Sequence, residues 1–197
     1  MKIKIIGAGL VGSSIANNLS INHQVELWDL NPCKFKIKKE VNFNIGDYTK
    51  TQGKYDGFIN CTYPFYNKKA SENMLDHSRV VESISTHFDN YYNSLQFAET
   101  ILKEGGSCIL FSSIYGLKIP NYQIYEKTNM FTGPDYIAAK AGLIKLVEYF
   151  AAKNKKIPLR FNCVSPGGIF NNQDKNFVSK YTSKTLYGEM LNPADLD

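Results

Sequence analysis

The sequence predicts an α/β fold, in which a doubly wound parallel sheet carries helices on both faces in a three-layer arrangement. Short apolar runs alternate with longer stretches of helical spacing, which is typical of strands joined by crossover helices. A second observation is the glycine pattern Gly7-Ala8-Gly9-Leu10-Val11-Gly12, which directly follows the first apolar run. A chain of 197 residues can bury one core and shows no interdomain linker, so one domain over residues 1–197 is expected.

The first unit is a strand at Ile3–Ile6, followed by the glycine turn and a helix ending near Leu19. Such a turn places backbone N–H groups at a pyrophosphate. The second strand, Val25–Trp28, ends at Asp29, about 20 residues after Gly9, the spacing at which a carboxylate accepts hydrogen bonds from an adenosine ribose. The unit therefore predicts a Rossmann-type dinucleotide site that prefers NAD to NADP, because the carboxylate would repel the extra phosphate.

Four more strands and two long helices complete the predicted fold. The strands are expected at Val41–Ile45, Tyr55–Asn60, Ser107–Phe111 and Ile157–Val164. The stretch Tyr48–Lys54 is too short for a crossover helix, so a loop is expected there. Helical spacing covers Ile84–Lys103, with Gly105-Gly106 as its C-terminal cap. Pro134 opens the second helix, which is expected over Asp135–Lys153.

Composition limits the classes of partner. The net charge of +5 would suit an anionic partner, but the densest basic run, Lys34–Lys39, is too short for a nucleic-acid platform and has no stacking module beside it. No apolar run is long enough to span a membrane, and no cleavage site follows the N-terminal apolar stretch. The four cysteines form no metal-binding pattern. We therefore expect no metal, no membrane and no nucleic acid, and a reducing cytoplasm as the compartment.

Tyr136 and Lys140 carry the strongest chemical signal. Their spacing on a helix places them one turn apart on the same face, so an ammonium would lie beside a phenol. One positive charge about 4 Å away is worth roughly 4 kcal/mol at an effective dielectric of 20. That would lower the phenol pKa from about 10 toward neutrality, which predicts a catalytic base. Without other motifs, a tyrosine and a lysine at this spacing are more often a half-buried tyrosine beside a solvated lysine.

Taken with the other motifs, this pair makes the chain similar to the short-chain dehydrogenase/reductase family. The resemblance rests on the glycine turn, Asn60-Cys61-Thr62, Ser112-Ser113-Ile114-Tyr115-Gly116, Tyr136 with Lys140, and Pro166-Gly167. It implies hydride transfer at a hydroxyl or ketone carbon. By this resemblance Ser113 orients the substrate oxygen, Tyr136 exchanges the proton, and Lys140 lowers the tyrosine pKa and holds the nicotinamide ribose. Ser112 is the rival of Ser113, but the active serine of the family is usually the second of the pair.

The resemblance also implies a set of cofactor-binding residues at the carboxyl ends of the strands. The set is Gly7, Gly9, Leu10, Val11, Gly12, Asp29, Asp47, Asn60, Cys61, Tyr136, Lys140, Pro166, Gly167 and Ile169. Some of these residues also have a structural alternative. Asn60 could satisfy backbone groups between neighbouring strands, and Gly167 could belong to an ordinary turn.

The chain departs from the family pattern at several places. Its first turn is tighter, and the segment between Ser113 and Tyr136 is longer than usual. The position that often holds a proton-relay asparagine carries His87, which could relay protons or be structural. The family's closing helix and strand do not follow the sixth strand. A sheet without the last family strand is therefore expected, with an exposed edge that would favour association.

From about residue 55 onward the chain resembles the flagellin-modification (PtmA-like) oxidoreductases. The similar segments are Tyr125–Met130, Pro134–Tyr136, Ser165–Gln173 and Gly188–Pro193. This group is associated with nonulosonic acids for bacterial surface glycans, which implies a phosphorylated or nucleotide-linked sugar as substrate. The family usually forms homodimers or homotetramers.

Two alternatives stay open. A nucleotide-sugar epimerase or dehydratase would share the tyrosine and lysine but needs a sizeable C-terminal substrate domain. A non-catalytic dinucleotide-binding module, or a decayed paralogue, is favoured by the short third crossover and the missing strand. The substrate, the reaction direction and the oligomeric state do not follow from these residues.

Overall fold

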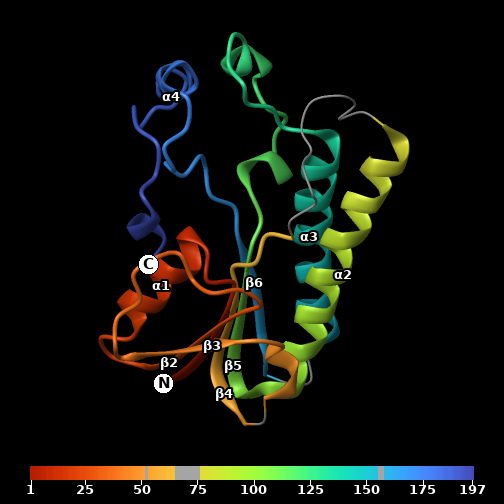
Figure 1. Cartoon of the computed structure of the whole chain (residues 1–197). Coiled ribbons are helices and arrows are strands. Elements are labelled where there is room, and N and C mark those ends of the chain that lie inside the picture. Colours follow the sequence, from red (N-terminus) through yellow and green to blue (C-terminus); the bar gives the residue numbers. More distant parts are fainter. Residues whose placement is uncertain (52, 65–75, 155–157) are drawn as a thin grey trace.

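The computed structural model describes residues 1–51, 53–64, 76–154 and 158–197 (Figure 1). Six parallel strands form one sheet in the order β3-β2-β1-β4-β5-β6, which confirms the predicted doubly wound parallel sheet. The strands are β1 (Lys2–Ile6), β2 (Gln24–Asp29), β3 (Val41–Ile45), β4 (Tyr55–Asn60), β5 (Leu102–Phe111) and β6 (Arg160–Val164). The helices are α1 (Leu10–Leu19), α2 (His77–Ile101), α3 (Pro134–Lys153) and α4 (Lys175–Thr182).

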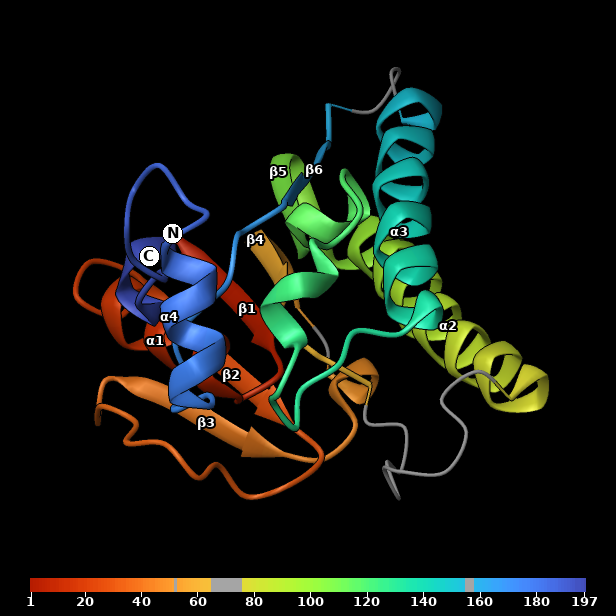
Figure 2. The ribbon, with the colours of Figure 1, turned by 90° about the horizontal axis from the view of Figure 1, so that it is seen from above.

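Helices cover both faces of the sheet, with α1 on one side and the pair α2 and α3 on the other (Figure 2). Successive side chains of a strand point to opposite faces, so Ile5 and Ile6 enter different cores. Ile5 packs with Ile15 of α1, whereas Ile6 packs with Leu95 of α2 and Leu143 of α3. Both faces of this parallel sheet are therefore apolar and buried, as the continuous apolar runs of the sequence indicate.

The α2–β5 segment differs from the sequence prediction. The helix begins at His77 and not near Ile84, because Asp76 caps it by accepting a hydrogen bond from the backbone N–H of Arg79. It ends at Ile101, so Gly105-Gly106 is not its cap and lies inside β5. There the pairing with β4 shifts register and β5 bulges, and Gly105 has the positive φ of +76° that favours glycine.

Apart from the start of the sixth strand, the other predicted elements are found within one or two residues of their expected ends. The connection between β3 and β4 is a loop with one 3₁₀ turn, Tyr48–Lys50, as expected. The sixth strand begins at Arg160, and its predicted start, Ile157, lies outside the described residues. After β6 the chain forms α4, and the 3₁₀ turn Pro193–Leu196 packs against α1. In the described part of the chain β6 forms one edge of the sheet.

The carboxyl ends of all six strands meet at one edge of the sheet, as parallel pairing requires. Two segments lie beyond this edge in Figure 1, the insert between β5 and α3 (residues 117–133) and the helix α4. Ligands of open α/β sheets bind at this edge. Within the described residues, no helix combines the length and apolar character needed to cross a membrane.

Candidate active site

The glycine turn packs tightly against the end of β4. Gly7 has a φ of +93°, and a Cβ on it would lie 2.6 Å from the backbone nitrogen of Thr62. A Cβ on Gly12 would lie 1.9 Å from the carbonyl oxygen of Gly7, so α1 could not approach the strand with any larger residue there. At Gly9, by contrast, nothing lies within 4 Å of the Cβ position. The turn is thus closed toward the protein and open toward solvent at its middle glycine.

This turn fits the pyrophosphate of a dinucleotide. Gly9 is the N-cap of α1 and provides no side-chain cap, and the first turn holds no acidic residue, so the positive end of the helix is left to an anion. Asp29, at the end of β2, accepts hydrogen bonds from the backbone N–H of Ala8 at 2.8 Å and of Asn31 at 2.9 Å. These bonds hold its carboxylate beside the turn, where an adenosine ribose would lie.

Asn60 connects β4 to α2. Its amide nitrogen donates to the hydroxyl of Ser94 at 2.8 Å and to the Asn90 side chain at 3.3 Å. Its oxygen accepts from the backbone N–H and the hydroxyl of Thr62 at 2.7 and 2.6 Å. The structure thus gives Asn60 a bracing role between β4 and α2, in place of the link between neighbouring strands considered from the sequence.

The two serines after β5 have different partners. Ser112 donates its hydroxyl to the carbonyl of Lys140 at 2.8 Å, which ties the strand end to α3. Ser113 accepts the backbone N–H of Tyr115 at 3.1 Å, and its hydroxyl lies near enough to the phenol of Tyr136 to lower the pKa of that phenol. This difference supports Ser113 as the serine that meets a substrate.

Lys140 is buried without a carboxylate partner among the described residues. Its side chain comes from α3, and the ammonium donates to the carbonyl of Phe111 at 2.7 Å. The same nitrogen lies 5.3 Å from the ring centre of Tyr91 and 5.7 Å from that of Tyr136. Because burial disfavours the charged form, the pKa of Lys140 falls to about 8.

The pKa of Tyr136 is raised, which is opposite to the direction expected from the sequence. Burial of the phenol is the largest cause, and the hydrogen bond with Ser113 offsets part of it. The expected effect of Lys140 is not seen, because its ammonium points to the Phe111 carbonyl and not to the phenol oxygen. In this arrangement Tyr136 is a protonated phenol that can donate a proton, and not a phenolate base.

His87 lies on α2 behind this pair, and it is 2% exposed. Its Nδ1 is 2.8 Å from the carbonyl of Ser83, so in the neutral ring Nδ1–H donates and Nε2 is left as an acceptor. Neither Nε2 of His87 nor the hydroxyl of Tyr91 has a hydrogen-bond partner in the described structure. Burial also lowers the pKa of His87, which keeps the ring neutral near pH 7.

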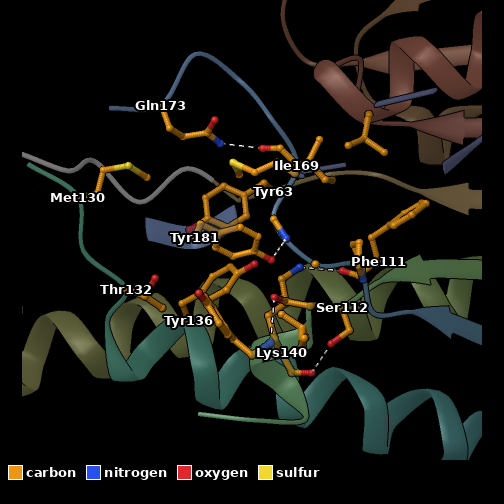
Figure 3. Close-up of a pocket in the computed structure, with 18 of the residues that line it drawn as sticks. Tyr63, Phe111, Ser112, Met130, Thr132, Tyr136, Lys140, Ile169, Gln173 and Tyr181 are labelled. Carbon is orange, nitrogen blue, oxygen red and sulfur yellow. Dashed lines mark hydrogen bonds between the residues drawn. The ribbon is translucent and has the colours of Figure 1, made fainter. Parts of the chain in front are cut away.

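These groups meet at a cavity of about 440 Å³ at the carboxyl ends of the strands (Figure 3). Of the residues predicted for the site, Val11, Cys61, Ser113, Tyr136, Lys140, Pro166, Gly167 and Ile169 line it. The others lie outside its lining: Gly7, Gly9, Leu10, Gly12, Asp29, Asp47, Asn60 and His87. Asp47 is exposed and caps the 3₁₀ turn after β3 through Thr49.

Sequence reasoning missed the aromatic wall of the cavity. Tyr125 comes from the insert, Phe177 and Tyr181 come from α4, and Tyr63 follows β4. The hydroxyl of Tyr181 accepts the backbone N–H of Gly168 at 2.5 Å, so α4 is held against the turn after β6 (Figure 3). No local pattern marks these residues, because they come from separate segments that only the fold brings together.

The described residues hold no cluster of histidine, cysteine, aspartate and glutamate that could bind a metal ion. Chemically, the site combines a hydroxyl for orienting an oxygen, a phenol that can give a proton, and a buried ammonium.

Comparison with known proteins gives matches over most of the chain. The family model for enoyl-(acyl carrier protein) reductases matches residues 31–189. The post-translational flagellin modification protein A of Campylobacter coli is 29% identical over 163 residues, which are 81% of this chain. The chain spans 64% of the length of that relative.

Solved structures show the same fold. The short chain dehydrogenase of Leptospira borgpetersenii serovar Hardjo-bovis, determined with bound NAD+, is 26% identical with a TM-score of 0.73. The match covers 99% of this chain and 82% of that one. BdcA in complex with NADPH has a TM-score of 0.75 at 14% identity, over 99% of this chain and 83% of its own.

Proposed function

The chain belongs to the short-chain dehydrogenase/reductase family, and we propose that it is an NAD-dependent enzyme that transfers a hydride at a hydroxyl or ketone carbon of a sugar-type substrate. One observation carries the proposal. Ser113, Tyr136 and Lys140 line the same cavity as Val11 from the glycine turn and Gly167 from the turn after β6. A serine, a tyrosine and a lysine with no cofactor site beside them would have no hydride to use.

The proposed chemistry follows from the protonation states. A nicotinamide cofactor supplies or accepts the hydride when bound. Ser113 holds the carbonyl oxygen of the substrate, and Tyr136, kept as a phenol by its raised pKa, donates its proton to that oxygen as the carbonyl is reduced. Lys140 keeps a positive charge or a labile proton close behind the phenol, since its pKa of about 8 lies near neutral pH.

Support for NAD comes from Asp29 at the end of β2, whose carboxylate is held beside the turn by Ala8 and Asn31. A negative charge there would repel the extra phosphate of NADP. The residues proposed to hold the cofactor are the glycine turn, Asp29, Asp47, Asn60, Cys61, Tyr136, Lys140, Pro166, Gly167 and Ile169.

The substrate class rests on the flagellin modification protein of Campylobacter coli, whose name ties that protein to flagellin modification. By analogy, a phosphorylated or nucleotide-linked sugar used for surface glycans is the proposed substrate. We further propose a single domain that carries both sites, assembly as a homodimer or homotetramer, and a reducing cytoplasm, in keeping with free thiols on all four cysteines.

The test is a titration with NAD and NADP, followed by a panel of sugars, sugar phosphates and nucleotide sugars read at the nicotinamide absorbance. Tighter binding of NAD and turnover of at least one sugar-type substrate are expected. Tighter binding of NADP would contradict the role of Asp29. Dinucleotide binding without turnover of any alcohol or carbonyl compound would favour the non-catalytic binding module instead.

A further inference from the structure

The described walls of the cavity are aromatic and hydroxylated, with few charges. Among the described lining residues only Asp135 and Lys140 carry a full charge. Asp135 accepts the hydroxyl of Ser83 at 2.6 Å, and the ammonium of Lys140 is bonded to the carbonyl of Phe111. No arginine and no second lysine lines the described part of the cavity, so Lys140, already bonded to Phe111, is the one cation that these described walls could offer to a phosphoryl group.

Three hydroxyls form a chain on this wall. The hydroxyl of Tyr125 donates to that of Tyr115 at 3.1 Å and lies 2.7 Å from the hydroxyl of Thr132. Tyr125 has a single proton, so when it donates to Tyr115 the bond with Thr132 must be donated by the threonine. The proton of Tyr115 is used by neither bond. Tyr115 is therefore a donor whose proton is available to a group in the cavity.

The position of Tyr115 is set by the catalytic segment itself. Its backbone N–H is bonded to the hydroxyl of Ser113, and its ring lines the same cavity as Tyr136. Burial and the bond from Tyr125 raise the pKa of Tyr115, so the group stays a phenol at any physiological pH. A hydrogen-bond donor thus lines the same cavity as Ser113 and Tyr136.

The size of the cavity limits its contents. A volume of about 440 Å³ must take the nicotinamide end of a cofactor as well as the substrate. This leaves room for one small ring. A nucleotide attached to that ring would have to extend out of the cavity.

We infer that the cavity takes an uncharged, polyhydroxylated ring, and that Tyr115 is the specificity-determining residue that donates a hydrogen bond to a second hydroxyl of that ring. The inference rests on the proposed function and names the part of the substrate that enters the site. A phosphoryl or nucleotide group, where a substrate has one, lies outside the described walls. Tyr125 and Thr132 orient the donor through the hydroxyl chain.

The first experiment compares Tyr115→Phe with the unchanged protein on two ketones, cyclohexanone and α-hydroxycyclohexanone. Loss of one hydrogen bond should lower kcat/KM about tenfold for the hydroxylated ketone and leave cyclohexanone nearly unchanged. Tyr122→Phe is the control, because Tyr122 is an exposed tyrosine of the same insert that does not line the cavity. Equal losses on both ketones would overturn the role of Tyr115.

The second experiment measures binding without turnover. Free aldohexoses and their phosphate monoesters are titrated against the NAD-saturated protein by ligand-observed saturation-transfer NMR. Free sugars should bind, their affinity should fall about tenfold in Tyr115→Phe, and the phosphate should add no affinity. No binding of any free sugar, or binding of the monoester more than about tenfold tighter, would overturn the inference.

The two results separate the inference from the proposed function. Sugar binding could depend on Tyr115 while no carbonyl compound is reduced. That result would support the inference about Tyr115 and contradict the proposed enzymatic function. Hydride transfer to both ketones, with equal effects of Tyr115→Phe on the two, would support the proposed function and contradict the inference about Tyr115.

Discussion

Two lysines are buried among the residues that the structure describes, and they lie in opposite kinds of surroundings. Lys4 is in the middle of β1 and is fully buried, and Lys140 is in α3 and is 4% exposed. Burial lowers the pKa of both. The two therefore share the direction of the pKa shift and its main cause, and they differ in what surrounds the ammonium.

Lys4 is compensated by its neighbours. Its ammonium lies 3.5 Å from a carboxylate oxygen of Glu26 and donates to the hydroxyl of Thr51 at 2.5 Å. It also lies over the rings of Trp28 and Tyr55 at 4.6 and 4.9 Å, and the hydroxyl of Tyr55 donates to the same carboxylate at 2.7 Å. A buried charge that is paired with a carboxylate and hydrogen bonded in this way has a structural role.

Lys140 has one hydrogen-bond acceptor, the Phe111 carbonyl, and no carboxylate among the described residues to balance it. It faces the cavity at the carboxyl ends of the strands. The comparison teaches that burial alone does not mark a functional lysine. The missing counter-charge, at the edge of the sheet where ligands bind, is what supports the role proposed for Lys140.

The largest effect should come from replacing each lysine in turn. Lys140→Met is expected to lower kcat/KM at least about 100-fold and to weaken NAD binding, whereas Lys4→Met should change turnover of the folded protein less than about threefold. Tyr136→Phe should lose as much turnover as Lys140→Met with NAD affinity nearly intact. Steady-state kinetics and NAD titration measure these changes. Equal losses of turnover in the two lysine variants would break the comparison.

The next effect concerns the pair around Lys4. Glu26→Gln leaves the buried ammonium unpaired while the amide oxygen can still accept from Tyr55. Its free energy of unfolding should fall by about 3 kcal/mol, toward the low end for a broken buried pair because Glu26 is partly exposed. Denaturant unfolding measures it. The double variant Lys4→Met, Glu26→Leu should recover most of the loss, and a double variant as unstable as Glu26→Gln would contradict this account.

A smaller effect is the pH dependence of stability from Lys140. Its folded pKa of about 8 lies below its ordinary value, so above pH 8 the folded state binds fewer protons at this site than the unfolded state. Stability at this site must then rise with pH, by about 2 kcal/mol between pH 8 and 10. The difference in unfolding free energy between the unchanged protein and Lys140→Met isolates this rise, since other groups cancel. A flat difference would mean that the lysine is well solvated.

The smallest effect should come from replacing His87. This replacement tests whether the imidazole relays protons to the site that contains Lys140. His87→Leu keeps the packing but removes Nε2, and kcat is expected to fall about tenfold with unchanged NAD affinity, below the effect of direct proton transfer. The pH profile of kcat should also lose the limb due to this imidazole, which lies on the acid side because its pKa is lowered. A variant with normal kcat and profile would make His87 a packing residue.

Much of the fold could be predicted because its signals are local. The alternation of apolar runs, the glycine turn before α1 and Pro134 at the start of α3 each depend on a few neighbouring residues. The boundary of α2 was missed because its start depends on the cap at Asp76, and its end on a register shift between β4 and β5. Such a shift is a property of two strands and cannot be read from either.

The sequence by itself determined which groups share a helix face and which strand ends meet at one edge, so it placed Ser113, Tyr136 and Lys140 in one site. Only the tertiary structure decided their charge states. The pKa of Tyr136 rises and that of Lys140 falls because both are desolvated by residues distant in the chain, and because the ammonium turns to the carbonyl of Phe111. Lys4 shows the same limit, since its burial is harmless only where β2 brings Glu26 beside it. Spacing is set by covalent geometry, whereas desolvation and charge pairing are set by packing between distant segments.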